Sequence, residues 1–308
     1  MSASVFLIAL GAPFLWALVN HTDKYLINRF FSGRANGGVG GLMIFSTFFS
    51  VLLLPFIFWM DRNVFDISLS GASLLVLAGF INALSILLYL YALNEDETTR
   101  VVPFMQLIPV FSFTFGYYLL GETITQSQLF GGFIIILGSS FLAIGGIQKD
   151  QKLYFKTKVV LLMVLHSIGF GLYGTLFKFV SLKEGFWSGA FWEAIGLVLA
   201  GCLLFSISSY RRDFLKIIRI NSRIVIGVNL LSELLTIIGN WLTSFASLMT
   251  KIALVSLVAG FQPVFVLIFG ILTTIFFPDI VKEDISKRDL FQKVSAIFII
   301  IIGTTLLY

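Results

Sequence analysis

The sequence predicts an all-α polytopic membrane protein in which ten transmembrane helices form two inverted five-helix repeats. Hydrophobic residues make up 58% of the 308 residues, charged residues only 12%, and the mean hydropathy is +0.98. A soluble domain usually carries about 25% charged residues, so lipid is the expected solvent. Ten long apolar runs and a residue pattern that recurs at half the chain length complete the prediction.

The ten apolar runs follow one another with short connections. Each has the roughly 20 residues needed to span about 30 Å of hydrocarbon, and all are too long and too uniformly apolar for barrel strands. The first, which no basic residue precedes, is expected to be a retained helix and not a signal peptide. The connection SYRRDFLKIIRINSR at 209–223 is expected to be a loop. The runs are 3–22, 39–60, 69–93, 100–120, 127–147, 157–181, 186–209, 222–249, 251–277 and 289–308.

The basic residues are distributed unequally between the two ends of these segments. Of the 21 Lys and Arg residues, 17 follow the odd-numbered segments. Positive charge in short loops marks the cytoplasmic side, which predicts that both termini are non-cytoplasmic. The net charge of +5 therefore indicates membrane orientation and not a nucleic-acid partner. The single cysteine, Cys202, excludes an internal disulfide and a Cys-based metal site, and it is expected to be a small buried hydrophobe.

An internal repeat relates the two halves. Tyr91-Ala92 and Pro109-Val110-Phe111 recur as Phe245-Ala246 and Pro263-Val264-Phe265, always 154 residues later, as do the pairs Gly116 and Gly270, and Lys24 and Lys178. Each half, 1–154 and 155–308, holds five segments. An odd number places the second half upside down relative to the first, which is the inverted repeat of many secondary transporters.

The stretch from Tyr91 to Gly138 resembles the EamA family of the drug/metabolite transporter superfamily. The shared features are Tyr91-Ala92-Leu93, Pro109, Gly121-Glu122, Gly131 and Gly138. The second half keeps Ala246 and Pro263, whereas Phe277-Pro278-Asp279 replaces the Gly-Glu pair. The resemblance implies two five-helix EamA-like repeats around a central cavity that moves small metabolites by alternating access, in a bacterial cytoplasmic membrane. Small four-helix relatives carry an essential Glu in their first helix, and this chain has none there.

One candidate site is a polar stripe on the eighth segment. Glu233 lies in a run without other ionisable residues from Ile224 to Thr250. At 100° per residue, it shares a face about 60° wide with Asn229, Thr236 and Asn240. An intramembrane carboxylate costs about 2.5–3.5 kcal/mol by insertion scales, so the stripe is expected to face a watery cavity. The alternative is structural hydrogen bonding between helices. Glu233 is also a candidate proton carrier.

Other polar residues inside apolar runs extend this prediction. His166 and Tyr173 share a face, as do Asn82 and Tyr89, and both pairs are candidates to line the cavity. Gln106 and Gln262 precede Pro109 and Pro263, where a helix kink can build a binding site or only a bend. For Glu193, the alternatives are proton coupling and snorkelling to the interface. Lys24 and Lys178 are expected to snorkel, and the alternative is anion attraction at each mouth of the cavity.

These features favour a secondary transporter for a small metabolite, with import and export both open. The alternative is a flippase, or a flippase subunit, for a lipid-linked substrate, which would need a cavity open to lipid. An intramembrane enzyme is disfavoured because no metal-ligand cluster or catalytic triad pattern is present, and no nucleotide-binding motif supports a pump. A channel stays open as an alternative. No cofactor and no metal are expected; the expected partners are the substrate and the bilayer, and the oligomeric state, a homodimer included, is left open.

Overall fold

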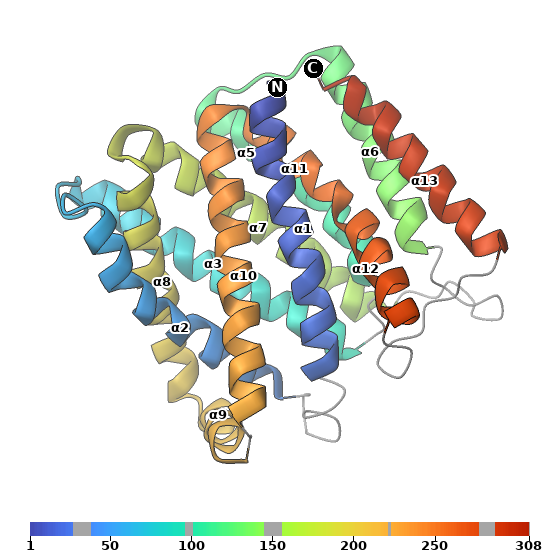
Figure 1. The fold of residues 1–308 in the computed structure, drawn as a ribbon. Helices are drawn as coiled ribbons and strands as arrows, with labels where there is room; N and C mark the ends of the chain where they lie inside the picture. The colour runs from blue at the N-terminus through green and yellow to red at the C-terminus, as the bar shows by residue number, and fades with distance from the viewer. Residues whose placement is uncertain (27–37, 96–100, 145–155, 221–222, 277–286, 308) are drawn as a thin grey trace.

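The computed structural model describes residues 1–26, 38–95, 101–144, 156–220, 223–276 and 287–307, which form a bundle of helices (Figure 1). No strand occurs among these residues. The elements are α1 Ala3–Leu26, α2 Val39–Met60, α3 Leu69–Glu95, the 3-10 helix η3 Val102–Leu107, α5 Ile108–Leu120, α6 Gln126–Ile144, α7 Thr157–Glu184, α8 Phe186–Ser206, α9 Ser208–Ile220, α10 Arg223–Met249, α11 Ile252–Val258, the 3-10 helix η4 Ala259–Phe261, α12 Gln262–Phe276 and α13 Lys287–Thr305.

The described part of the chain contains six helices that are long and apolar enough to cross a membrane. Two shorter apolar helices, Phe104–Leu120 and Val294–Thr305, accompany them. The predicted all-α membrane architecture is therefore confirmed for the described residues, whereas the count of ten spans stays a prediction. The six candidate spans are Ala3–Asn20, Val39–Met60, Leu69–Glu95, Thr157–Glu184, Phe186–Ser206 and Ile252–Leu272.

Two of the predicted segments are broken at equivalent places. The 3-10 helix η3 ends at Leu107, directly before α5, and η4 ends at Phe261, directly before α12. Pro109 and Pro263 each occupy the second position of the helix that follows, where proline costs little because its missing N–H has no helical acceptor. These prolines therefore begin new helices inside the membrane-spanning segments.

Helices from the two halves interleave in the bundle. α3 packs against α7 and α8, α1 packs against α10 and α12, and α6 pairs with α13 along one edge (Figure 1). Glycines permit the closest crossings: a Cβ on Gly79 of α3 would lie 2.1 Å from the Glu193 carbonyl oxygen, and one on Gly196 of α8 would lie 2.1 Å from the Val76 carbonyl oxygen. Small residues at such crossings let helix backbones approach each other in a membrane.

Two expectations from the sequence are wrong. Most of the connection 209–223 forms the helix α9, because Tyr210 and Phe214, one turn apart, both contact neighbouring helices. The Phe214 ring centroid lies 6.0 Å from that of Phe48 on α2 and 6.0 Å from that of Phe205 on α8, and the Tyr210 hydroxyl is hydrogen-bonded to the Tyr91 hydroxyl of α3. The exposed basic side chains of α9 had suggested a loop. Cys202, expected to be buried, is exposed on α8 because it points away from the helices that α8 contacts.

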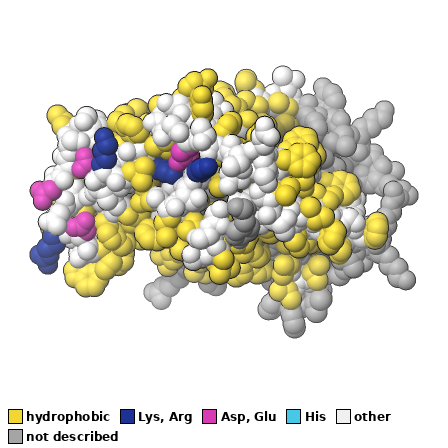
Figure 2. Space-filling view, turned by 90° about the horizontal axis from the view of Figure 1, so that it is seen from above, with side chains coloured by type: hydrophobic (Ala, Val, Ile, Leu, Met, Phe, Trp, Pro, Cys, Tyr) yellow, Lys and Arg dark blue, Asp and Glu magenta, His cyan; other side chains and the backbone are white. Residues whose placement is uncertain are grey.

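The two termini meet at the same end of the bundle. The Met1 ammonium donates a hydrogen bond to the Leu307 carbonyl oxygen at 3.2 Å, and α9 lies at the opposite end (Figure 1). Seen from the end with the termini, the described surface is mainly hydrophobic and uncharged, with a few acidic and basic side chains (Figure 2). We call this end the terminal face below.

Candidate functional site

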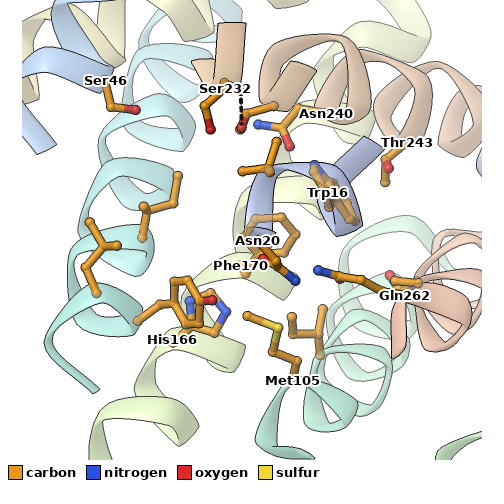
Figure 3. Close-up of a pocket in the computed structure, with 18 of the residues that line it drawn as sticks. Trp16, Asn20, Ser46, Met105, His166, Phe170, Ser232, Asn240, Thr243 and Gln262 are labelled. Carbon is orange, nitrogen blue, oxygen red and sulfur yellow. Dashed lines mark hydrogen bonds between the residues drawn. The ribbon is translucent and has the colours of Figure 1, made fainter. Parts of the chain in front are cut away.

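A cavity of about 210 Å³ lies at the centre of the bundle (Figure 3). Helices α1, α2, α3 and α5 of the first half and α7, α10 and α12 of the second half contribute to its walls. Pockets for drug-sized ligands measure about 300–1,000 Å³, so this cavity suits a smaller molecule. Most of the predicted site residues line it: Tyr89, Gln106, His166, Asn229, Glu233, Thr236, Asn240 and Gln262.

The polar stripe of α10 forms one wall of the cavity. The Ser46 hydroxyl of α2 donates a hydrogen bond to Glu233 Oε2 at 2.7 Å. On the same helix, the Thr22 hydroxyl of α1 donates a hydrogen bond to the Ser232 hydroxyl at 3.1 Å. The Thr236 hydroxyl donates to the Ser232 carbonyl oxygen at 2.9 Å. The stripe therefore both contacts neighbouring helices and faces the cavity. Glu233 can serve a structural role, through its hydrogen bond to Ser46, and a functional role, through its place in the cavity wall.

His166 presents a polar atom to the cavity without a hydrogen-bond partner in the described residues. Its Nδ1 lies 2.9 Å from the Ser85 carbonyl oxygen. A carbonyl only accepts, so Nδ1 donates and the opposite ring nitrogen, Nε2, has no partner there. The imidazole ring is held between Tyr89 and Phe170, whose ring centroids lie 5.6 Å and 5.8 Å away. This arrangement fixes the ring while offering Nε2 to a ligand.

Glu193 does not snorkel to the interface as one sequence interpretation expected. Its side chain is buried, Asn82 Nδ2 donates to Glu193 Oε1 at 3.2 Å, and the Tyr173 hydroxyl contacts the same carboxylate. The neighbouring Trp192 on α8 donates a hydrogen bond to the Val64 carbonyl oxygen at 2.8 Å. Asn82 and Glu193 lie outside the lining of the central cavity, unlike Tyr89 on the same face of α3.

Tyr173 lines a second, smaller cavity of about 30 Å³ beside the central one. The faces shared by Asn82 and Tyr89 and by His166 and Tyr173 are therefore present, but each runs from the central cavity toward the buried cluster around Glu193. Two turns of helix separate the members of each pair by roughly 10 Å, which is why only one member of each pair reaches the central cavity.

The expectation that Lys178 snorkels is wrong. Its side chain is 6% exposed, its ammonium is paired with the Glu122 carboxylate, and it lies outside the lining of the central cavity. Glu122 supplies the counter-charge that a buried ammonium requires when it does not reach water. The side chain of Lys24, its counterpart in the first half, lies outside the described residues.

Several cavity residues were not predicted from the sequence. Trp16 and Asn20 lie one turn apart on α1 and both line the cavity (Figure 3). A signal for them existed, since Asn20 is a polar residue at the end of the first apolar run, on the same face as Trp16. Ser46 and Thr243 carried no such signal, because hydroxyl side chains are common in membrane helices and often bond to their own backbone.

The fold and the cavity together define an α-helical integral membrane protein built around a central cavity with polar and apolar lining residues. Residues 3–144 match the EamA-like transporter family. This match confirms the resemblance to the EamA family found in the sequence.

Two further comparisons identify a relative in sequence and a protein that shares the fold. The chain is 28% identical over 148 residues to a probable amino-acid metabolite efflux pump of Salmonella typhimurium strain LT2, an alignment that covers 45% of this chain and 48% of the relative. The chain thus matches about half the length of that relative. A solved crystal structure shares the fold with a TM-score of 0.63 at 13% identity, covering 99% of this chain and 96% of that one.

Proposed function

We propose that this protein is a secondary transporter that moves a small metabolite across the membrane by alternating access. The observation that carries the proposal is the central cavity, whose polar walls come from both halves of the chain. Substrate sites of many secondary transporters lie at the interface between two repeats near the middle of the membrane. The EamA-like match of residues 3–144 supports the same function.

The proposed architecture is two EamA-like units, 1–154 and 155–308, related by a rotation of about 180° about an axis in the membrane plane. Helix boundaries support it at the sequence offset of 154. α1 begins at Ala3 and α7 at Thr157; α3 spans Leu69–Glu95 and α10 spans Arg223–Met249. The breaks between η3 and α5 and between η4 and α12 keep the same offset. Helix ends that recur in register indicate a duplicated unit.

We propose that the terminal face is non-cytoplasmic and that the protein resides in a bacterial cytoplasmic membrane. The basic helix α9, which carries Arg211, Arg212, Lys216 and Arg219, lies at the end opposite the termini, where the positive-inside rule predicts the cytoplasm. The relative from Salmonella supports a bacterial membrane.

Glu233 is the residue that we propose both contacts the substrate and carries a coupled proton. Ser46 orients its carboxylate at the cavity wall, and the buried Glu193 is a second candidate for proton coupling. The other lining residues supply neutral donors and acceptors together with aromatic surface, which suits a molecule the size of an amino acid. They are Trp16, Asn20, Tyr89, Gln106, His166, Phe170, Asn229, Thr236, Asn240 and Gln262. The efflux-pump relative favours export of an amino-acid-like metabolite.

Counterflow in proteoliposomes tests this function. Vesicles preloaded with an unlabelled amino acid or amino-acid derivative should accumulate the labelled compound transiently, and the rate should saturate. A channel would equilibrate the label without this overshoot. A flippase would instead be inhibited most strongly by compounds that carry long acyl tails, because its cavity must admit them from the bilayer. Absence of overshoot across amino acids, amines and organic acids would contradict the proposal.

A further inference from the structure

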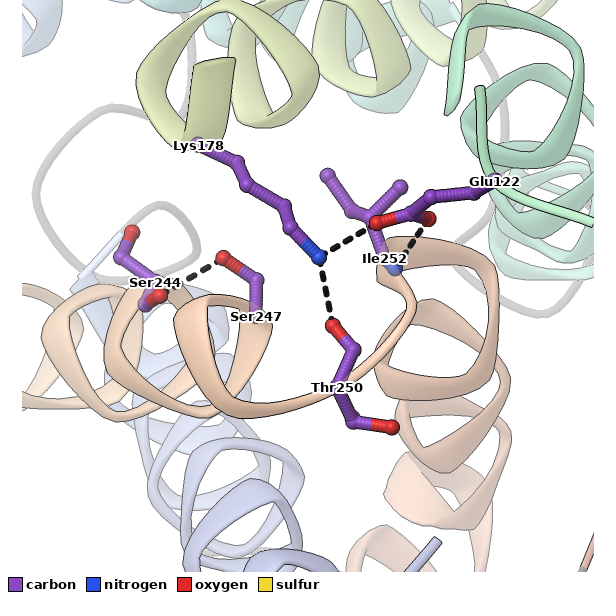
Figure 4. Close-up of polar contacts among 6 residues, drawn as sticks. All are labelled: Glu122, Lys178, Ser244, Ser247, Thr250 and Ile252. Atoms are coloured by element: carbon purple, nitrogen blue, oxygen red, sulfur yellow. Dashed lines mark hydrogen bonds and ion pairs between the residues drawn. The ribbon is translucent and has the colours of Figure 1, made fainter. Parts of the chain in front are cut away.

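A buried polar junction lies near the terminal face, away from the central cavity. Lys178 of α7 donates to Glu122 Oε1 and, at 2.6 Å, to the Thr250 carbonyl oxygen at the end of α10 (Figure 4). The second carboxylate oxygen of Glu122 accepts from the Ile252 N–H at 2.8 Å. One ion pair therefore ties the end of α5, in the first half, to α7 and the α10–α11 connection in the second half.

The local sequence folds Glu122 back onto this junction. Gly121 ends α5 with a φ of 65°, a left-handed conformation that glycine adopts at little cost. The chain then reverses, and the Glu122 N–H donates to the Gly116 carbonyl oxygen at 3.1 Å. A Cβ on Gly116 would lie 3.1 Å from Glu122 Oε2 and 3.0 Å from Ile252, so this second glycine leaves room for the carboxylate.

A small chamber whose walls carry several hydroxyl side chains lies beside the central cavity and shares Ile252 with this junction. It is the small cavity of about 30 Å³ on which Tyr173 lies, and Trp16, Phe170, Asn240, Thr243 and Ser256 line both spaces. Its remaining walls include Ser112, Tyr173, Ser244, Ser247 and Ile252. Ile252 is thus both a wall of the chamber and the backbone donor to Glu122. α10 runs from the end near α9 toward the terminal face (Figure 1), so Ser244 lies closer to that face than Glu233 does, and Thr250 directly follows the helix.

The structure assigns this chamber as the translocation route to the terminal face, and we propose that the Lys178–Glu122 ion pair closes it in the conformation described. This inference rests on the proposed transport function. Hydroxyl side chains lie along the route, and the two halves meet at the ion pair, so relative movement of the halves would separate Lys178 from Glu122. Water entering the opened route would then solvate both charges.

A buried pair of this kind suits a two-state closure. While water is excluded, each charge requires the other, since an isolated buried charge is strongly unfavourable. Once water reaches the junction, the pair contributes little, as exposed ion pairs do. The closed and open arrangements are therefore both tolerable, whereas a half-open, dry arrangement is not. Such bistable contacts allow a small movement to open a route fully.

Thiol accessibility tests the proposal without any substrate. In a Cys202→Ser background, Ser247→Cys places a reporter in the chamber, and Ser127→Cys, exposed at the terminal face beside the Leu306 carbonyl oxygen, is the positive control. A membrane-impermeant thiol reagent is applied from the terminal face. With the ion pair intact, the Cys at 247 should react slowly. Glu122→Gln, which keeps an acceptor for the Ile252 N–H but removes the carboxylate charge, should raise the rate at least tenfold.

Two matched variants protect this test against misfolding and against general effects of charge removal. Glu122→Gln combined with Lys178→Gln leaves no unpaired charge and should also raise the labelling rate. Glu95→Gln removes a carboxylate from the exposed pair with Lys158, which measures 2.5 Å, and should leave labelling unchanged. If the Cys at 247 is labelled at the same rate with the Lys178–Glu122 pair intact and in both Glu122→Gln variants, the proposed gate is contradicted, even if transport is normal. Faster labelling in both the single and the double variant would support the gate. If the protein with the intact ion pair then shows no counterflow of any compound, the proposed transport function is contradicted while the gate is supported.

Discussion

Ser46 on α2 donates a hydrogen bond of 2.7 Å to Glu233 on α10, joining the first half of the chain to the second at the wall of the central cavity. The bond orients a carboxylate that an apolar helix would otherwise have to expose at considerable cost. Through this bond, a helix of the first half fixes the position of an ionisable group on a helix of the second half. Relative movement of the halves would therefore change the surroundings of Glu233 directly.

Replacing Glu233 with Gln should preserve the fold and abolish or uncouple transport. Glutamine keeps the shape and can still accept the Ser46 hydrogen bond, but it lacks the charge and the titratable proton. Substrate flux by the purified, monodisperse variant should fall at least tenfold or lose its dependence on pH. Wild-type flux with unchanged pH dependence would leave Glu233 with only a structural role, and Leu at the same position should then unfold the protein.

Replacing Lys178 with Met should destabilise the protein by about 3–5 kcal/mol, because Glu122 then stays buried without its counter-charge. The measurement is thermal unfolding in detergent. Adding Glu122→Gln should recover much of the loss, since no isolated charge remains. Lys158→Met, at an exposed pair, is the control and should leave the unfolding temperature unchanged. A loss of the same size in the double variant would show that the charge interaction is not the cause.

Replacing Gly79 with Ala should weaken the crossing of α3 and α8. The new Cβ would overlap the Glu193 carbonyl oxygen, 2.1 Å away, so the helices must separate, at a cost of about 1–3 kcal/mol. Gly227→Ala on α10 meets nothing within 4 Å and should be neutral or stabilising by up to about 1 kcal/mol. The difference in unfolding temperature between the two variants measures the packing effect, and equal stability would refute a tight crossing.

A reporter protein active only in the cytoplasm, fused after Tyr308, should be inactive. The basic helix α9 lies at the opposite end of the bundle from the termini, so the termini are expected on the non-cytoplasmic side. The same reporter inserted after Arg212 should be active. Strong activity at the C-terminus, together with inactivity after Arg212, would reverse the proposed orientation and place the Lys178–Glu122 gate on the cytoplasmic side.

The helices and one wall of the cavity follow from the sequence because they depend on local patterns. Uninterrupted apolar runs predict membrane helices, and the spacing of Asn229, Glu233, Thr236 and Asn240 places four polar groups on one face whatever that face contacts. α9 was not predicted because its sequence is rich in exposed basic residues, and the partners of Tyr210 and Phe214 lie on other helices.

The partners of buried charges depended on the tertiary structure. Lys178 could reach water or a carboxylate, and only the packing of α7 beside the end of α5 brings Glu122, 56 residues away in the chain, to its ammonium. Glu193 likewise lies inward because Asn82, on another helix, meets it at 3.2 Å. Local sequence determines which helix face is polar, since the helix repeat is constant; which polar group that face meets is decided by the packing of helices distant in sequence.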